Sequence, residues 1–308
     1  MILVTGASGT IGSALVERLI ADGHAPRVSS RHPSSLTERW PSLEAVQLDV
    51  LRPLTLAPAL DSVTAAYYLV HSMEPSAQGG FSERDADGAR AFAEAALEEG
   101  VERVIYLGGL GDEGPELSEH LASRHETGRI LAESGPPLLE FRAAMVVGAD
   151  SASFRMLNDL VNRLPAMIVP RWVETPSQPI ATDDVVTYLI SGLTTDLVDG
   201  HTIVEIGGPQ VLTYREMIEV VARRRGRDPL IVGVPFLTPR LSSYWCGLTT
   251  SVPSALARPL IEGMSTPMVA DLTEAAKRFP DVHPIAFTEA LERASTEESS
   301  SNHDPGSE

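Results

Sequence analysis

Cysteine and lysine are the two residues that this sequence has least of. Its 308 residues include one cysteine, Cys246, and one lysine, Lys277. A single cysteine excludes a disulfide within the chain and any metal site built from several cysteines, and it agrees with a reducing compartment. We expect Cys246 to be a small buried apolar residue. We expect no metal site, because the sequence has no HExxH motif and no carboxylates clustered at metal-ligand spacing.

Positive charge and long apolar runs are scarce as well. The chain has 42 acidic and 24 basic residues, a formal net charge of −18. Nucleic acids and anionic membranes bind proteins through positive patches, so this balance argues against both as partners. No apolar run is long enough to span a bilayer, and we expect no signal peptide, because the first residues form a strand without a basic region before it. The sequence therefore predicts a cytoplasmic protein that binds a small molecule, as a monomer or a homodimer.

The first twelve residues carry the most informative motif. The apolar strand Ile2–Val4 runs into three glycines, and an amphipathic helix follows. In a dinucleotide-binding turn the first glycine permits the tight turn, the second lets the diphosphate approach the backbone, and the third lets the helix pack on the sheet. The helix N-terminus then favours the negative phosphates. The predicted cofactor-binding residues of this turn are Gly6, Ala7, Ser8, Gly9, Thr10, Ile11 and Gly12.

Strands and helices alternate through the first half of the chain, which predicts a parallel sheet covered by helices on both faces. The expected fold class is α/β, a Rossmann-type doubly wound parallel sheet with a small C-terminal substrate lobe. The cofactor-binding core is expected over residues 1–150, with 180–210 returning to the sheet, and the lobe over 151–180 and 211–294. The acidic, serine-rich tail 295–308 has too little apolar content to fold and is expected to be disordered.

With these motifs in hand, the chain resembles the short-chain dehydrogenase/reductase superfamily. The resemblance is to the atypical or extended branch, which includes NmrA-like proteins and the NAD(P)H-binding accessory subunit of respiratory complex I. Within that branch it is similar to a prokaryotic subgroup of uncharacterised NAD(P)-binding oxidoreductases. Besides the glycine turn, the similar segments are YYLVHSM at 67–73, YLGGLG at 106–111, SRHE at 123–126 and PRLSSYW at 239–245. This resemblance implies a fold and a cofactor rather than a particular substrate.

The end of the second predicted strand determines the choice of cofactor. In a Rossmann-type site an acid at this place binds the ribose 2′-hydroxyl of NAD, whereas an arginine pairs with the 2′-phosphate of NADP. The residues here are Ser29–His32, with no acid. Arg31 can donate two hydrogen bonds to a phosphate and stack on adenine, so we favour NADP, with NAD as the alternative. The competing interpretation is that Arg31 is a solvated loop residue.

The resemblance implies further cofactor contacts at the next two strand ends. Asp49 and Val50 would hold the adenine, and Leu69, Val70 and His71 would pack against the second ribose and the diphosphate. Asp49 is equally explained as the cap of the next short helix. His71 is equally explained as a polar residue at the end of a strand.

The catalytic set departs from the pattern of the family. Active members carry a serine or threonine at the end of the fifth strand, then a tyrosine and a lysine four residues apart on one helix face. The lysine lowers the tyrosine pKa, and the tyrosine exchanges a proton with the substrate. Here the serine position falls on Gly108 and Gly109, which have no hydroxyl and would border the cofactor. His120 replaces the tyrosine, Arg124 replaces the lysine and Ser123 is kept.

Two hypotheses about function follow. In the first, Arg124 holds the ribose hydroxyls and His120 donates the proton, so the protein is an NAD(P)H-dependent oxidoreductase that acts on a small apolar carbonyl, enone or quinone-like compound. In the second, it binds the dinucleotide without turnover, as a redox sensor or an assembly or accessory factor. A nucleotide-sugar epimerase or dehydratase is a third possibility, weakened by the missing tyrosine.

Overall fold

The structure is a computed structural model. It describes residues 1–71, 81–111, 114, 117–163, 166–169, 171–197, 200–228, 230–233 and 263–301. Cys246 and the segment 239–245 therefore lie outside the described residues.

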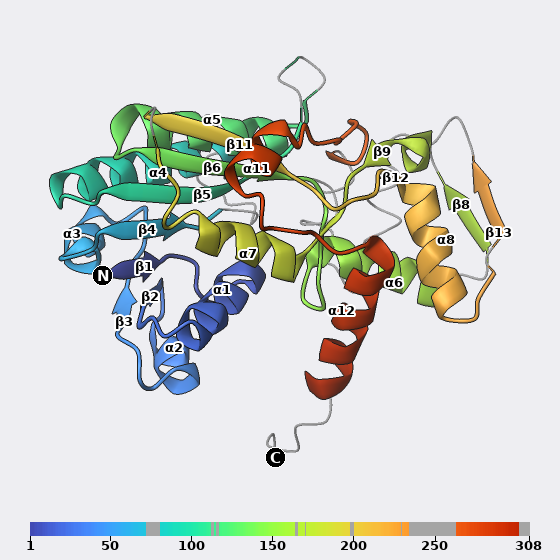
Figure 1. Ribbon diagram of the computed structural model, residues 1–308, viewed down its shortest axis with the longest axis horizontal. Helices are drawn as coiled ribbons and strands as arrows, with labels where there is room; N and C mark the ends of the chain where they lie inside the picture. Colours follow the sequence, from blue (N-terminus) through green and yellow to red (C-terminus); the bar gives the residue numbers. More distant parts are fainter. Residues whose placement is uncertain are drawn as a thin grey trace.

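A seven-stranded parallel sheet forms the centre of the protein (Figure 1). The strands lie in the order β11-β6-β5-β4-β1-β2-β3, and each neighbouring pair is parallel. Their bounds are β1 Ile2–Val4, β2 Arg27–Ser30, β3 Ala45–Gln47, β4 Ala65–Tyr68, β5 Arg103–Gly109, β6 Leu138–Ala143 and β11 His201–Ile206. The predicted Rossmann-type fold is confirmed. Because the strand order reverses between β1 and β4, the carboxyl ends of these strands border the crevice where doubly wound sheets bind ligands.

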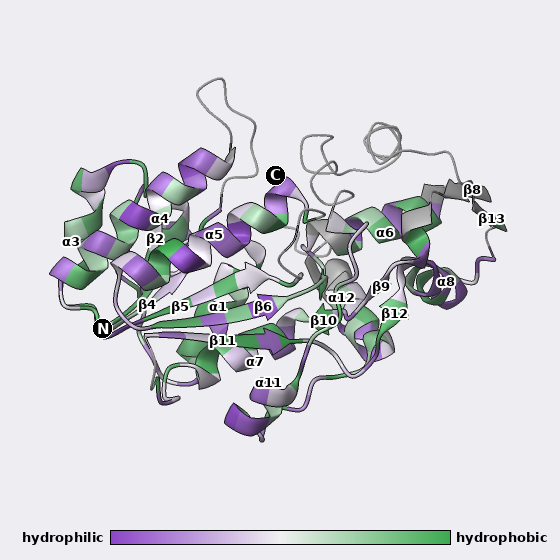
Figure 2. Ribbon diagram, turned by 90° about the horizontal axis from the view of Figure 1, so that it is seen from above, coloured by the Kyte–Doolittle hydropathy of each residue, from purple (hydrophilic) through white to green (hydrophobic). Residues whose placement is uncertain are grey.

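Helices cover both faces of the sheet, with α4 and α5 on one side and α7 and α11 on the other (Figure 2). The first layer consists of α3 Leu56–Leu60, preceded by the 3-10 turn η1 Pro53–Thr55, then α4 Phe81–Glu98 and α5 Glu119–Ser134. The second consists of α1 Thr10–Ala21, α2 Ser34–Arg39, α7 Thr182–Ser191 and α11 Thr273–Arg278. Each layer buries a separate apolar core against the sheet.

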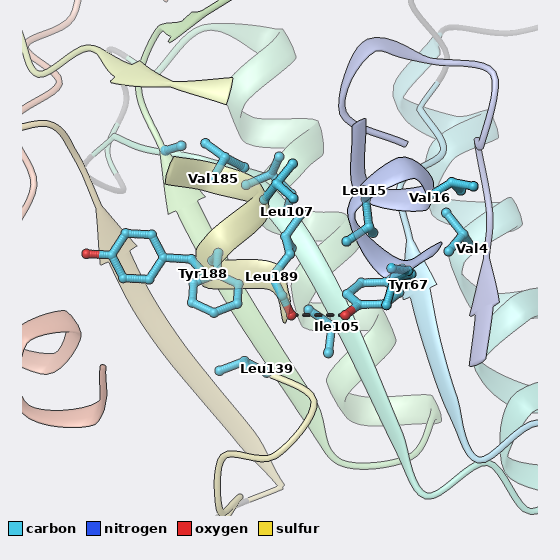
Figure 3. Packing of buried hydrophobic residues seen from close by; sticks show 14 of the residues in the cluster. Val4, Leu15, Val16, Tyr67, Ile105, Leu107, Leu139, Val185, Tyr188 and Leu189 are labelled. Carbon is cyan, nitrogen blue, oxygen red and sulfur yellow. Dashed lines mark hydrogen bonds between the residues drawn. The ribbon is translucent and has the colours of Figure 1, made fainter. Parts of the chain in front are cut away.

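Tyr67 of β4 shows how the second layer is fixed. Its ring is fully buried, and Leu15 of α1 belongs to the same core. The hydroxyl of Tyr67 donates a hydrogen bond of 3.0 Å to the carbonyl of Leu189 in α7 (Figure 3). A strand beside the crevice is thereby tied to a helix 122 residues later in the chain.

A third apolar core lies at the other end of the molecule, on the right in Figure 1, in the region predicted to form a lobe. Short strand pairs join its segments: β7 with β10, β9 with β12 and β8 with β13. The elements are β7 Val146–Val147, α6 Ala152–Arg163, β8 Ala166–Val169, η2 Arg171–Glu174, β9 Pro176–Ser177, β10 Ile180–Ala181, β12 Leu212–Thr213, α8 Tyr214–Arg224, β13 Leu230–Gly233 and α12 Phe287–Ser301.

The C-terminal segment differs from its prediction. Helix α12 continues to Ser301, so the disorder expected from residue 295 is wrong for Ser295–Ser301. The reason is that Ala290, Leu291 and Ala294 are buried in the lobe core, and the helix that they anchor extends beyond its last apolar residue. Within the ranges given above, no helix combines the length and the apolar content needed to cross a membrane.

Candidate cofactor and active site

The junction between β1 and α1 has the backbone geometry of a dinucleotide-binding turn. Gly6 has a φ of +63°, and a Cβ atom there would lie 2.7 Å from the carbonyl oxygen of Leu69. A Cβ on Gly12 would lie 2.2 Å from the carbonyl oxygen of Gly6. Both positions therefore require glycine for close approach of two backbone segments.

The same junction leaves a surface that suits a diphosphate. Ser8 and Gly9 are exposed, and Gly9 is the N-cap of α1. The first turn of α1 has no acidic residue. The first N–H groups of a helix have no partner within it, and they attract anions together with the helix dipole. The glycine turn thus fits the diphosphate of a dinucleotide, and the hydroxyl of Thr10 ties it to the carbonyl of Asp150 at 3.2 Å.

Thr5 shapes the end of β4 next to this turn. Its buried hydroxyl donates to the carbonyl of Tyr67 at 2.9 Å and accepts the N–H of Leu69 at 3.0 Å. The backbone of Leu69 is thereby held against Gly6. Leu69 and Val70 are half-buried, and His71 is exposed at the end of the strand. The predicted second-ribose residues therefore lie beside the glycine turn.

Arg31 follows β2 and lies on the surface. Its carbonyl accepts a hydrogen bond of 3.2 Å from the side-chain amide of Gln47, at the end of β3. Among the described residues, no carboxylate pairs with the Arg31 guanidinium. Its full charge is therefore available to an anion at this strand end.

The predicted adenine contacts, Asp49 and Val50, are both engaged within the protein. The Asp49 carboxylate accepts the N–H of Leu51 at 3.1 Å and pairs with Arg52 at 3.5 Å. It therefore caps a turn rather than a helix, since the N-cap of η1 is Arg52. Val50 packs against α4, where a Cβ on Gly88 would lie 2.7 Å from Val50 Cγ2.

His71, His120 and Arg124 come together at the carboxyl edge of the sheet. The two imidazole rings are 6.5 Å apart between centroids. Arg124 lies one turn after His120 on α5, close enough for its charge to act on both rings. His120 and Arg124 are half-buried and His71 is exposed, so the group opens to solvent.

The electrostatics of this group keep both histidines neutral. Desolvation first, and then the charge of Arg124, lower the pKa of His120 to about 4. Desolvation of its ring by the surrounding atoms, then Arg124 and then His120 lower the pKa of His71, although part of the residue stays exposed. The sequence-based proposal assumed a histidine that titrates near neutral pH. The structure instead gives a neutral imidazole, which can donate or accept a hydrogen bond at pH 7 but carries no extra proton.

Gly108 and Gly109 show why no hydroxyl stands at the serine position. A Cβ on Gly109 would lie 2.6 Å from Leu121 Cδ2, and a Cβ on Gly108 would lie 3.0 Å from Glu140 Oε1. Neighbouring side chains of the protein fill the space that a serine would use.

Ser123 is not part of the group at the sheet edge. It is buried between α4 and α5, and its hydroxyl donates to the carboxylate of Asp85 at 3.4 Å. The structure therefore separates this predicted catalytic residue from His120 and Arg124, and we assign it to helix packing.

Tyr106 is the residue of this site that sequence reasoning missed. The Arg124 guanidinium lies 4.9 Å from the centre of its ring and donates to the carbonyl of Leu107. The Tyr106 hydroxyl donates in turn to the carbonyl of Arg124 at 3.0 Å. Tyr106 and Arg124 lie 18 positions apart in the sequence, and no periodicity of the sequence would have revealed their contact.

A buried ion cluster lies under α5, beside the site. Glu140 is fully buried, and its two oxygens bind Arg142 at 2.7 Å and His201 at 2.8 Å. Burial alone would raise the pKa of Glu140, but these two hydrogen bonds hold it below its usual value. A Cβ on Gly128 would lie 2.4 Å from Glu140 Oε2, so this position of α5 packs closely on the Glu140 side chain. Across the part of the chain that the structure describes, no group of histidine, cysteine and acidic side chains could hold a metal ion.

Comparisons with known proteins agree with this geometry. Residues 6–135 match the NAD(P)H-binding family. The chain is 27% identical over 285 residues to a ceramide reductase of Caulobacter vibrioides, an alignment that covers 89% of this chain and 88% of that protein. It is also 27% identical over 228 residues to the (4-alkanoyl-5-oxo-2,5-dihydrofuran-3-yl)methyl phosphate reductase of Streptomyces griseus, covering 74% of each protein.

Among solved structures, a nucleoside-diphosphate-sugar epimerase from Staphylococcus aureus superposes with a TM-score of 0.75. The identity is 16%, and the superposition covers 94% of this chain and 99% of the epimerase. At this identity the likeness concerns the fold.

Proposed function

We propose that the chain belongs to the atypical, NmrA-like branch of the short-chain dehydrogenase/reductase superfamily and that it is an NADP-dependent oxidoreductase acting on a small apolar carbonyl, enone or quinone-like compound. The observation that carries this proposal is the meeting of two features at one edge of the sheet. The glycine turn after β1 and the group His71, His120 and Arg124 both border the crevice at the carboxyl ends of the strands.

Arg31 supports NADP over NAD. Its guanidinium, which pairs with no carboxylate among the described residues, follows the second strand, where a Rossmann-type site would bind the adenosine ribose, and no acid stands there to bind a free 2′-hydroxyl. A 2′-phosphate would accept two hydrogen bonds from it.

The proposed roles at the other end of the cofactor follow from the side chains present. Bound NADPH would supply a hydride at the nicotinamide ring. Arg124 has five N–H donors, of which the carbonyl of Leu107 occupies one, so the others can hold the ribose hydroxyls. The imidazole of His120, whose ring centre lies 6.5 Å from that of His71, would hydrogen-bond the substrate oxygen. Two relatives that are reductases by name support this direction of the chemistry.

The first experiment is to measure NADPH and NADH binding to the purified protein by fluorescence, then NADPH oxidation with a panel of quinones, enones and aldehydes. We expect tighter binding of NADPH and turnover with at least one acceptor class. His120→Ala should reduce that turnover while NADPH still binds.

The alternative function is a dinucleotide sensor or accessory factor, and the departures at Gly109 and His120 favour it. Tight NADPH binding without oxidation of NADPH by any acceptor would support this alternative and contradict the enzyme.

A further inference from the structure

Three donor groups from two segments of the chain converge at the opening of the site. His71 follows β4, His120 lies in the first turn of α5, and Arg124 lies one turn later. The rings of the two histidines are 6.5 Å apart, and Arg124 acts on both. A substrate oxygen placed between them would meet N–H groups from more than one side.

Arg124 is fixed in place and carries an unbalanced charge. The Tyr106 ring and the carbonyl of Leu107 hold its guanidinium, and the Tyr106 hydroxyl holds its backbone. In the described part of the chain, no carboxylate lies within ion-pair distance of it. An anion that forms in the substrate would therefore meet a positioned positive charge that gives up no proton, because the arginine pKa exceeds 12.

The histidines strengthen this property. With its pKa lowered to about 4, His120 is a neutral donor at pH 7. A neutral imidazole N–H is a suitable partner for an enolate oxygen, as in isomerases that polarise a carbonyl with an uncharged histidine. It is a poor proton source for an alkoxide. The position where the family places a serine is Gly109, and Leu121 fills the space beside it.

Resting on the proposed function, we propose that His71, His120 and Arg124 form an oxyanion site, and that the substrate is an α,β-unsaturated aldehyde or ketone reduced at its carbon–carbon double bond. The β carbon accepts the hydride from the reduced nicotinamide. The π electrons move toward the carbonyl oxygen and form an enolate, which the three side chains stabilise. The α carbon then takes a proton from water. The sum is one hydride and one proton added across the double bond, with NADP⁺ as the oxidised product.

Reduction of a saturated ketone would require a proton donor in the site. Hydride addition to its carbonyl carbon gives a localised alkoxide, which needs a proton from the protein at once. Arg124 and two neutral histidines do not supply one readily, so saturated ketones should react slowly.

The kinetic test compares 2-cyclohexenone with cyclohexanone, using NADPH deuterated at nicotinamide C4. We expect a preference of about 100-fold for the enone, in line with the loss when oxyanion donors are mismatched, and deuterium at the β carbon of the product. Equal rates with the two compounds, or label on the carbonyl carbon, would overturn the proposal.

A binding test needs no turnover. The probe is p-nitrophenol, whose phenolate is yellow and resembles an enolate in charge and delocalisation. We expect the protein to bind it as the phenolate, and Arg124→Met to weaken binding roughly tenfold or more, the loss typical of a charged hydrogen bond. The control is Arg129→Met, which removes one charge from an exposed face of the same helix.

The outcomes separate the two proposals. If no acceptor oxidises NADPH but the phenolate binds through Arg124, the proposed function and the enone substrate fail and the oxyanion site remains. If NADPH is oxidised with saturated carbonyls and no phenolate binds, the proposed function stands and the oxyanion site is overturned.

Discussion

The β1–α1 junction and the β5–α5 junction are both strand-to-helix turns rich in glycine, but their glycines do different things. At Gly6 and Gly12 the added Cβ atoms would strike backbone, the carbonyls of Leu69 and Gly6. At Gly109 the added Cβ would strike the side chain of Leu121. In the first turn, glycine lets two backbone segments approach each other and leaves Ser8 and Gly9 exposed. In the second, the protein has filled the place of a hydroxyl with an apolar side chain.

The glycine turn keeps the pattern of a dinucleotide-binding motif, while the β5–α5 junction on the same sheet departs from the pattern that the resemblance implies. The cofactor junction depends on backbone geometry, which tolerates no side chain. The role that we propose for the β5–α5 junction depends on the side chains of His120 and Arg124, and the ring and hydroxyl of Tyr106 hold Arg124 in place. Substitutions at the two junctions should therefore fail in different ways.

The largest effect is expected at the first junction. Gly12→Val places a branched side chain where even a Cβ would lie 2.2 Å from the Gly6 carbonyl. We expect loss of NADPH binding and a drop of more than about 3 kcal/mol in the free energy of unfolding, measured by urea denaturation. The control is Gly200→Ala, since a Cβ there meets nothing within 4 Å. Normal NADPH affinity in Gly12→Val would contradict the claim that the β1–α1 junction needs glycine to bind the cofactor.

The second junction should tolerate a side chain at a moderate cost. Gly109→Ser presses on Leu121, and we expect about 1–3 kcal/mol of destabilisation with NADPH binding retained. Adding Leu121→Ala should relieve the contact, so the double variant should be more stable than the sum of the two single effects predicts. Strict additivity in denaturation experiments would show that Leu121 is not what excludes the serine.

A substitution of Arg31 tests binding of the adenosine 2′-phosphate without disturbing the glycine turn. Arg31→Ala should weaken NADPH binding roughly 10- to 100-fold, the value of charge-assisted hydrogen bonds to a phosphate, and leave NADH binding nearly unchanged. Arg39→Ala is the matched control, because Arg39 is exposed and pairs with Glu17. If the NADPH preference survives Arg31→Ala, the assignment of the 2′-phosphate is wrong.

A third junction, β10–α7, extends the comparison to acid–base behaviour and should give the smallest effect. Burial raises the pKa of Asp184 to about 6, although its carboxylate accepts the N–H of Ile285 at 2.9 Å. A carboxyl whose pKa is higher in the folded protein contributes stability at acidic pH, and this contribution is lost as the pH rises through about 6.

Asp184→Asn removes this titration and keeps an oxygen acceptor. We expect the variant to melt about 1–3 °C above the parent at pH 8, with a smaller difference at pH 5, as measured by scanning calorimetry. The control is Asp87→Asn on α4, because its carboxylate is exposed, pairs with Arg90 and takes no part in the pKa shift of Asp184. A difference that does not change with pH would contradict the raised pKa.

The sequence predicted the sheet and the glycine turn because both depend on local patterns. Ile2–Val4 before Gly6, and the return of residues 180–210 to the sheet, follow from apolar runs and connection rules, and the structure adds that β11 takes the edge beside β6. The sequence did not predict the turn at Asp49 or the extension of α12 to Ser301, because both depend on contacts that form only in the folded protein.

The candidate site was predicted only in part. The spacing of His120 and Arg124 placed them on one helix face. It did not show that Ser123 turns toward Asp85 or that Tyr106 anchors the guanidinium, since these depend on how α5 rotates against α4 and β5. The lowered pKa of His120 is likewise a product of desolvation and of the neighbouring Arg124 charge in the folded protein.

The central claim is that the rebuilt β5–α5 junction supports a reaction, and single-turnover oxidation of saturating NADPH tests it most directly. With an enone acceptor, we predict that the purified protein oxidises its bound NADPH and that Arg124→Met slows this step about 100-fold, while Arg129→Met does not. Stable NADPH in the parent protein with every acceptor, or equal rates in the parent and Arg124→Met, would contradict the account.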